Sequence, residues 1–305
     1  KAPGTPASES SMSSHENQRR TFVIFNPASG RGAGAKRIDL YLDLLRKRLP
    51  EFKHAITSRP REESELAAQA VADGFELIVA VGGDGTWSNV ADRLVSLGNP
   101  SVALGLLPSG TGNDFGRNFG ISPRSPADAV DILARGVVTE TDVGRVVSAG
   151  APLGDAADQT TDESPVTGRH FLNLVGFGFD VAVIEDTAGA HFLRGELLYK
   201  VTALKNLFSF KGVAFELMSD EPGVDGDHLM LTISNAPFFG GGFLIAPSAE
   251  LNDGLLDACA IGDSSPFSMI LRNLNSKGSK PNSWAITSME LSKAKTICVA
   301  PGPRM

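Results

Sequence analysis

The sequence contains little that would suit a disulfide-stabilised or membrane-spanning protein. It holds two cysteines in 305 residues, Cys259 and Cys298, and both have apolar neighbours. Two cysteines cannot form a disulfide framework, so we expect buried free thiols and a reducing, cytoplasmic location. No stretch approaches the roughly eighteen apolar residues of a membrane-spanning helix, and the N-terminus lacks the order of a secretory signal.

Basic residues are also scarce relative to acidic ones. The chain has 28 Lys and Arg against 35 Asp and Glu, which gives a formal net charge of -7. Binding to a nucleic-acid backbone needs a concentrated basic face, and the sequence contains no block of basic residues. We therefore expect no nucleic-acid partner.

The length is sufficient for about two domains of ordinary size. Residues 1–18 are rich in Ser, Pro, Gly and Ala without a periodic apolar pattern, which predicts a disordered tail. Over residues 19–138, apolar strands alternate with amphipathic helices, a pattern typical of an α/β domain whose parallel sheet has helices on both faces. Residues 139–305 predict a mainly β domain with a long surface loop over 148–169.

The spacing of apolar residues also predicts the individual elements. In the first domain we expect helices over residues 38–49, 61–72, from near 86, and 126–135, and buried strands over residues 22–25, 77–81 and 102–107. In the second domain we expect one helix over residues 193–210, and strands over residues 170–175, 213–217, 228–233 and 255–261.

The strongest chemical signal is the turn Gly82-Gly83-Asp84-Gly85-Thr86, which directly follows an apolar strand. A strand-to-helix turn at the carboxyl edge of a parallel sheet can bind phosphate, because the first helical N–H groups are unpaired. Asp84 beside a polyphosphate would be repulsive unless a divalent cation lay between them, as in phosphoryl transfer. The alternative is an ordinary tight turn in which Asp84 caps the helix.

Two further polar turns follow buried strands. One is Pro108-Ser109-Gly110-Thr111-Gly112-Asn113-Asp114-Phe115, whose hydroxyls, backbone N–H groups and Asn113-Asp114 pair suit phosphate oxygens and a metal held through water. It is no P-loop, because Thr111 occupies the lysine position. The other is Asn26-Pro27-Ala28-Ser29-Gly30, whose following glycines do not fit the dinucleotide fingerprint. The alternative is an ordinary Asx turn for residues 108–115 and a flexible connection for residues 26–30. Parallel strands would, however, bring all three turns to one edge of the sheet.

Together the three turns resemble those of the diacylglycerol kinase catalytic domain, particularly in the bacterial soluble lipid kinases. The shared motifs are Asn-Pro-x-Ser-Gly, Gly-Gly-Asp-Gly-Thr and Leu-Pro-x-Gly-Thr-x-Asn-Asp-Phe. Residues 173–180, 241–247 and 252–257 resemble the first long strand and the late motifs of that family's β domain. The resemblance covers Thr21 to the end of the chain. It implies a nucleotide-binding α/β domain and a C-terminal β-sandwich, with ATP and lipid meeting in the cleft.

The resemblance also implies roles for individual residues. Asp84 and Asp114 are expected to be catalytic and to organise Mg²⁺, partly through waters. A structural Mg²⁺ is expected at Asp253, Glu250 and the Leu255 carbonyl, the alternative being a solvated loop. Contacts with ATP are expected from Asn26, Pro27, Ala28, Ser29, Gly30, Thr57, Gly83, Gly85, Thr86, Asn89, Gly110, Thr111 and Asn113.

The implied activity is ATP- and Mg²⁺-dependent transfer of the γ-phosphate to the hydroxyl of diacylglycerol, giving phosphatidic acid, or to a related lipid. Two alternatives stay open: a nucleotide-binding regulatory module without transfer activity, and an NAD-type kinase that shares the Gly-Gly-Asp-Gly loop. The lipid is expected at a membrane surface. Residues 191–211 mix basic and apolar side chains, which suits peripheral membrane contact or an ordinary helix packed on the sandwich. A homodimer is left open.

Two features depart from the family's pattern. Trp87, Ser88 and Asn89 stand where bacterial members usually have Leu-Asn-Glu. The family's proposed general base, a glutamate in an Asp-Gly-Glu motif, is expected shortly after residues 295–300, whereas the sequence ends at Met305. We therefore expect a truncated C-terminus and a chain that binds nucleotide but transfers phosphate slowly.

Overall fold

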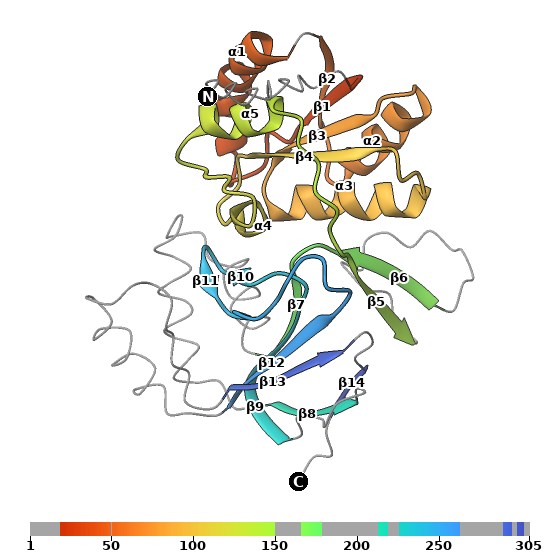
Figure 1. Cartoon of the computed structure of the whole chain (residues 1–305), viewed down its shortest axis with the longest axis vertical. Coiled ribbons are helices and arrows are strands. Elements are labelled where there is room, and N and C mark those ends of the chain that lie inside the picture. Colours follow the sequence, from red (N-terminus) through yellow and green to blue (C-terminus); the bar gives the residue numbers. More distant parts are fainter. Residues whose placement is uncertain are drawn as a thin grey trace, which may run out of the picture.

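The computed structural model describes residues 19–49, 51–149, 166–178, 213–218, 226–262, 289–294 and 298–301. These residues form an α/β domain and an antiparallel β domain, stacked along the long axis of the molecule (Figure 1). The fold class expected from the sequence is confirmed. The tail over 1–18 and the helix expected over 193–210 lie outside the described residues.

The first domain is built on a parallel four-stranded sheet in the order β2-β1-β3-β4. Its strands are β1 (Thr21–Phe25), β2 (Phe52–Ile56), β3 (Leu77–Gly82) and β4 (Ala103–Pro108). Strands β1, β3 and β4 occupy the expected apolar runs. Strand β2 was not expected, because it lies at an edge of the sheet and its residues are only partly buried or exposed, so it has no continuous apolar run.

Helices cover both faces of this sheet (Figure 1). Helices α1 and α5 pack together on one face, and α2 and α3 pack together on the other. Helix α3 begins earlier than the sequence suggested, so Asp84 is its first residue. The helices are η1 (Ala33–Arg37), α1 (Ile38–Arg48), α2 (Glu62–Ala72), α3 (Asp84–Leu97), α4 (Asp114–Arg117) and α5 (Pro126–Ala134).

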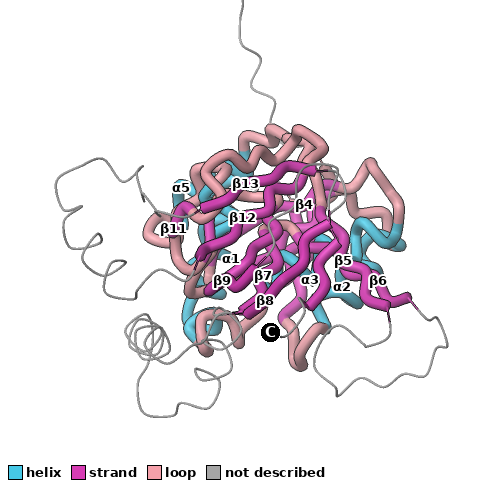
Figure 2. Tube along the Cα trace, turned by 90° about the horizontal axis from the view of Figure 1, so that it is seen from below, coloured by secondary structure: helices cyan, strands magenta, loops and turns pink. Residues whose placement is uncertain are grey.

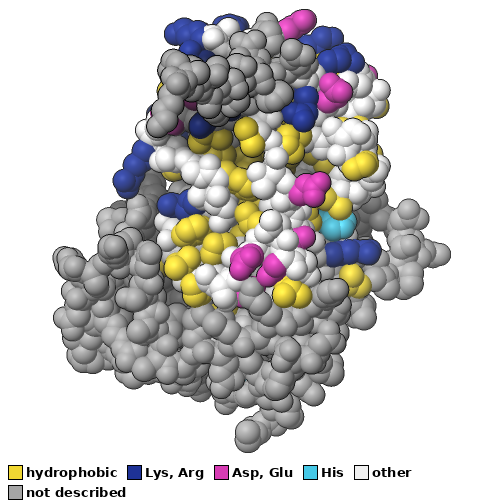
Figure 3. All heavy atoms as spheres, in the orientation of Figure 1, with side chains coloured by type: hydrophobic (Ala, Val, Ile, Leu, Met, Phe, Trp, Pro, Cys, Tyr) yellow, Lys and Arg dark blue, Asp and Glu magenta, His cyan; other side chains and the backbone are white. Residues whose placement is uncertain are grey.

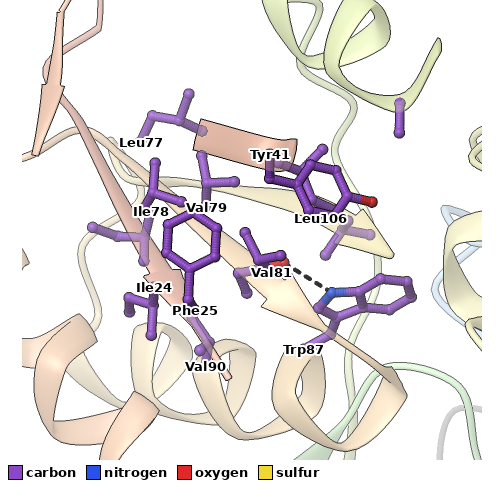
Figure 4. Close-up of a cluster of buried hydrophobic side chains, with 14 of the residues drawn as sticks. Ile24, Phe25, Tyr41, Leu77, Ile78, Val79, Val81, Trp87, Val90 and Leu106 are labelled. Atoms are coloured by element: carbon purple, nitrogen blue, oxygen red, sulfur yellow. Dashed lines mark hydrogen bonds between the residues drawn. The ribbon is translucent and has the colours of Figure 1, made fainter. Parts of the chain in front are cut away.

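The core of this domain lies directly behind the ends of β3 and β4. All six residues of β3 are buried. Trp87 is fully buried, and its indole Nε1 donates a hydrogen bond of 3.0 Å to the Ala80 carbonyl (Figure 4). Tyr41 is also fully buried and donates to the Pro108 carbonyl at 2.7 Å, and burial raises its pKa to about 12. These two bonds fix the first turns of α3 and α1 against the sheet, and each buried aromatic ring adds about 1.5–3 kcal/mol of stability.

The second domain contains an antiparallel sheet, seen from below in Figure 2. The order is β13-β12-β9-β8-β14, and β7 also pairs with β9. Leu231, Ile233, Ala258 and Ala260 form its buried cluster. Cys259 is a buried free thiol, as expected, and burial raises its pKa to about 11. The strands are β7 (Leu174–Gly178), β8 (Val213–Met218), β9 (Gly226–Ser234), β12 (Leu256–Gly262), β13 (Met289–Ala294) and β14 (Cys298–Pro301).

Two short hairpins complete the described part of the chain. Strand β5 (Gly144–Ala149) pairs with β6 (Val166–Phe171), and β10 (Phe238–Phe239) pairs with β11 (Phe243–Leu244). Within the described ranges, no helix combines the length and apolar character needed to cross a membrane.

Two sequence-based boundaries in this region are wrong. The surface loop expected over 148–169 is too long at both ends, because residues 148–149 and 166–169 belong to β5 and β6. Backbone pairing holds this ribbon, so its sequence needs few bulky apolar side chains. The residues expected to form a single strand over 170–175 belong to two strands, β6 and β7, which are separated by Leu172 and Asn173. At this break the Asn173 carbonyl accepts the N–H groups of Asn235 and Ala236.

Candidate active site

The strand order of the first sheet defines where a ligand would bind. The chain passes from β1 outward to β2 and then crosses back to β3 on the other side of β1. The carboxyl ends of β1 and β3 therefore flank a switch in winding direction, which is the usual ligand-binding position in open α/β sheets. The first turn (residues 26–34) and the second turn (residues 82–86) follow these two strands, and the third turn (residues 108–115) follows β4 beside them.

The first turn contacts both of the others. The Asn26 side chain donates from Nδ2 to Thr86 Oγ1 at 2.9 Å, and the hydroxyls of Ser29 and Ser109 are 2.6 Å apart. Gly30 has a φ of +59°, and a Cβ there would lie 2.7 Å from the Ser109 carbonyl oxygen. The three turns therefore meet at one edge of the sheet, as the sequence predicted.

The second and third turns touch backbone to backbone. A Cβ on Gly110 would lie 2.4 Å from the Cα of Gly83, so only glycine allows this approach. Asn113, at a φ of +53°, closes the third turn with its side chain. Its Oδ1 accepts the Gly110 N–H at 3.0 Å, and its Nδ2 donates to the Gly110 carbonyl at 2.8 Å.

Asp84 is half-buried at the start of α3, facing the third turn. Its Oδ1 accepts the Phe115 N–H at 3.0 Å. A Cβ on Gly112 would lie 3.0 Å from Asp84 Oδ2 and 3.1 Å from Asp114 Oδ2, so both carboxylates flank this glycine. Burial raises the pKa of Asp84, and the negative charge of Asp114 raises it further, against the lowering effect of the hydrogen bond from Phe115.

Asp114 is more deeply buried and held by other partners. Only 4% of its surface is exposed. Its Oδ1 accepts from Arg117 Nε at 3.2 Å, and its Oδ2 accepts the Gly241 N–H at 2.9 Å. Gly241 lies in the β domain, so both domains hold this carboxylate.

The two carboxylates fit a divalent cation. Carboxylate oxygens are ligands that Mg²⁺ prefers, and two like charges on either side of one glycine are stabilised by a cation between them. Among the residues that the structure describes, no group of three or more His, Cys, Asp or Glu side chains forms a metal cluster. A Mg²⁺ ion held by Asp84 and Asp114 would therefore complete its coordination with water and phosphate oxygens, as this ion usually does.

Five further residues expected to contact nucleotide lie in the three turns or follow β2 at the same edge of the sheet. Pro27 and Ala28 belong to the first turn, where the Ala28 N–H donates to Asn26 Oδ1 at 3.0 Å. Thr57 follows β2 at the same edge of the sheet. Thr111 and Gly85 are exposed, and a Cβ on Gly85 would meet nothing within 4 Å.

Asn89 lies one turn farther along α3, where its amide is already bonded on both sides. Its Nδ2 donates to Glu63 Oε1 at 2.8 Å, and its Oδ1 accepts from Arg169 Nη2 at 2.6 Å. The structure therefore places Asn89 between α2 and β6. Sequence reasoning missed both partners, because no local motif links residues so far apart in the chain.

The second predicted metal site lies in the β domain, apart from the three turns. Its three residues, Glu250, Asp253 and Leu255, lie between β11 and β12. Asp253 Oδ1 accepts the Leu255 N–H at 3.0 Å, which is the geometry of an Asx turn. Asp142 joins this loop, because its Oδ2 accepts the Gly254 N–H at 2.7 Å. A structural Mg²⁺ here stays a prediction.

Charge is distributed unevenly on the face drawn in Figure 3. Acidic side chains lie at the level where the two domains meet, next to basic and His side chains, and most of the Lys and Arg on this face lie around the outer edge of the α/β domain. Fold and turns together define a class of protein: an α/β domain in which three glycine-rich turns meet at one edge of the parallel sheet, joined to an antiparallel β domain.

Comparison with known proteins identifies the family. Residues 20–146 match the diacylglycerol kinase catalytic domain, and residues 173–291 match the YegS C-terminal NAD kinase beta sandwich-like domain. A diacylglycerol kinase of Mycobacterium tuberculosis is 29% identical over 78% of this chain and 72% of its own length. A probable YegS-like lipid kinase of Xanthomonas euvesicatoria is 30% identical over 72% of this chain and 67% of its own length.

A solved structure shows the same fold. The crystal structure of a putative diacylglycerol kinase from Bacillus anthracis superposes with a TM-score of 0.67 at 19% identity, over 93% of this chain and 86% of that one. The chain belongs to the family of YegS-like lipid kinases, and its residues 20–146 match the diacylglycerol kinase catalytic domain.

The contact between the second and third turns predicts the effect of adding one methyl group. Gly110→Ala should lower the free energy of unfolding by about 1–3 kcal/mol, because its Cβ would overlap the Gly83 backbone. Gly85→Ala is the matched control in the same junction. Its Cβ enters open space on a helix, so stability should stay the same or rise by up to about 1 kcal/mol. Urea unfolding followed by circular dichroism measures both, and equal stability of the two variants would contradict the contact.

The raised pKa of Asp84 predicts a pH-dependent gain in stability for Asp84→Asn. Because the folded state binds this proton more tightly than the unfolded state, wild-type stability falls as pH rises from the ordinary value of 3.8 through the raised one. The variant should therefore have the higher Tm at pH 7, and the difference should disappear below pH 4. The exposed control Glu51→Gln should show no such trend. A constant difference at all pH values would refute the prediction.

Proposed function

We propose that this protein transfers the γ-phosphate of ATP to the hydroxyl of a lipid, with diacylglycerol as the first acceptor to test and phosphatidic acid as the product. Its family membership supports a kinase. One observation carries the finer proposal: Asp84 and Asp114 flank Gly112 where three glycine-rich turns meet. This junction pairs anion-binding backbone with cation-binding carboxylates, which is the combination that phosphoryl transfer requires.

The backbone of the junction suits a triphosphate. The first N–H groups of a helix have no intrahelical partner, and the positive end of the α3 dipole lies at residues 83–86. The space beside Gly85 lets a phosphate oxygen approach these groups closely. The third turn adds the exposed hydroxyl of Thr111 on the other side. We assign the phosphates to the open side of this junction, next to Gly85 and Thr111.

The carboxylates would set the charge balance of the reaction. When bound, Mg²⁺ would neutralise part of the charge on the phosphate oxygens, and Asp84 and Asp114 are the residues that would hold it. In the transfer, the bond from the γ-phosphorus to the bridging oxygen breaks and ADP leaves with that bonding pair, while a bond to the acceptor oxygen forms and the acceptor hydroxyl releases its proton to water. Little covalent chemistry falls to the protein, so fixed placement of these two carboxylates is its main contribution.

The acceptor would approach from the side of the β domain. Residues of this domain already reach the junction, since the Gly241 N–H donates to Asp114. A lipid hydroxyl has to arrive from a membrane or micelle surface, so we propose peripheral contact with a lipid surface. Residues 191–211, expected to form that contact or a packed helix, lie outside the described residues.

Transfer of radiolabelled phosphate from ATP tests the proposal. Full-length protein is incubated with Mg²⁺, ATP and mixed micelles of diacylglycerol, ceramide or a sphingoid base, and in parallel with NAD. We expect label in phosphatidic acid, and a loss of about 10²- to 10³-fold in kcat for Asp84→Asn. Glu51→Gln, which changes an exposed carboxylate directly before β2, is the control and should keep the wild-type rate.

The other outcomes decide between the alternatives. Label in NAD alone would identify an NAD-type kinase. Binding of MgATP without label in any acceptor would identify a regulatory module. Wild-type and Asp84→Asn proteins with equal transfer rates would remove Asp84 from the reaction.

A further inference from the structure

Among the described residues, the two domains contact each other between α3 and β6 and also between α4 and the β10–β11 hairpin (Figure 1). Helix α4 is a single turn that begins with Asp114 and ends with Arg117. The hairpin turn consists of residues 240–242, between β10 and β11 of the β domain. Among the described residues, Asp114 is the junction carboxylate that bonds to this hairpin, so the contact reaches directly into the candidate active site.

Three hydrogen bonds close a ring across this contact. Arg117 Nε donates to Asp114 Oδ1 at 3.2 Å, and Arg117 Nη2 donates to the Gly241 carbonyl at 3.2 Å. The Gly241 N–H in turn donates to Asp114 Oδ2 at 2.9 Å. We call this set the Asp114–Arg117–Gly241 ring. Because both carboxylate oxygens accept a bond, the ring leaves the Asp114 side chain little freedom to rotate.

The hairpin turn is shaped to accept the arginine. Gly240, Gly241 and Gly242 have φ values of +61°, +92° and +108°, a region that other residues rarely adopt. A Cβ on Gly242 would lie 2.9 to 3.2 Å from the guanidinium of Arg117. The turn therefore lies directly against the arginine, and a side chain at position 242 would displace the guanidinium.

The chemistry of the ring requires arginine in particular. The guanidinium fork reaches a carboxylate from Nε and a carbonyl from Nη2 at the same time, which a lysine ammonium on a flexible chain does not reproduce. Asp114 is buried, while 34% of the Arg117 side chain is exposed. The charge pair is therefore partly screened, and its main effect is to orient the buried carboxylate.

We propose that Arg117 is a positioning residue, which together with Gly241 holds the Asp114 carboxylate in place. The active site is then complete only when the β-domain hairpin contacts α4. The inference rests on the proposed function, because Asp114 matters for catalysis only if phosphoryl transfer occurs at the junction. It assigns a role in orientation to Arg117 and Gly241, which are not among the residues expected to contact ATP.

The kinetic test separates orientation from binding. Full-length Arg117→Gln should lose about 10- to 100-fold in kcat, because misplacement of a catalytic group by about 1 Å costs up to 10²-fold. The KM values for ATP and lipid should stay within about threefold of wild type. Arg117→Lys should recover part of kcat, since it keeps the charge without the fork. Arg124→Gln, an exposed arginine in the connection after α4, is the matched control and should behave as wild type.

A second measurement needs no activity. Hydrogen exchange of the peptide covering residues 238–244, measured without nucleotide, should be faster in Arg117→Gln than in wild type, because the Gly241 N–H loses its fixed acceptor. Gly242→Ala should act on the same contact. In a double-mutant cycle with Arg117→Gln, the kcat of the double variant should therefore be no lower than that of the less active single variant.

The results that overturn the inference are distinct from those that overturn the function. An unchanged kcat in Arg117→Gln, or a rise in KM alone, would show a structural tether without a role in orientation. Unchanged exchange at residues 238–244 would show that the ring does not hold the hairpin. A wild-type protein without transfer to any acceptor would instead refute the proposed function, and the exchange data would still decide on the ring.

Discussion

The candidate active site depends on one close contact, between the backbones of Gly83 and Gly110. The register of the sheet sets it up, because Gly82 at the end of β3 pairs with Pro108 at the end of β4. The two turns thus begin level with each other, and the Gly82 carbonyl accepts the N–H groups of both Ser109 and Gly110. Without side chains on Gly83 and Gly110, the third turn comes near enough for the Phe115 N–H to reach Asp84.

This contact brings the carboxylates of Asp84 and Asp114 close together, and their mutual repulsion opposes folding. Asp84 is half-buried near a second carboxylate, and its raised pKa shows that the charged form is destabilised there. The core behind the turns offsets this cost: buried Trp87 and Tyr41 bond to carbonyls of β3 and β4 close to the same edge. A stable scaffold that carries an unfavourable arrangement of charge is typical of catalytic sites. The β domain adds one further bond to this junction, from the Gly241 N–H to Asp114.

The sequence predicted those parts of this arrangement that follow from local patterns. Strands β1, β3 and β4 are continuous apolar runs because they are buried, and the amphipathic spacing of α1 and α2 is equally direct. Convergence of the three turns followed from parallel strands alone. The roles of Asp84, Asn113 and Asp114 were argued from their turns, those of the other turn residues came from the family resemblance, and all of these roles stay predictions.

The remaining features depend on tertiary contacts that leave weak local signals. Strand β2 lies at an edge and has exposed side chains, and the β5–β6 ribbon is held by backbone pairing. The Asp114–Arg117–Gly241 ring joins residues from two domains. Its only sequence signals are the helical spacing of three between Asp114 and Arg117 and a run of glycines at residues 240–242.

The most direct test is a crystal structure of the protein with Mg²⁺ and a non-hydrolysable ATP analogue. We predict that the terminal phosphates lie within about 3 Å of backbone N–H groups of residues 83–86 and 111–112, with the ion between the phosphates and Asp84. A triphosphate bound on another surface, with this junction empty and the three turns unchanged, would contradict the account.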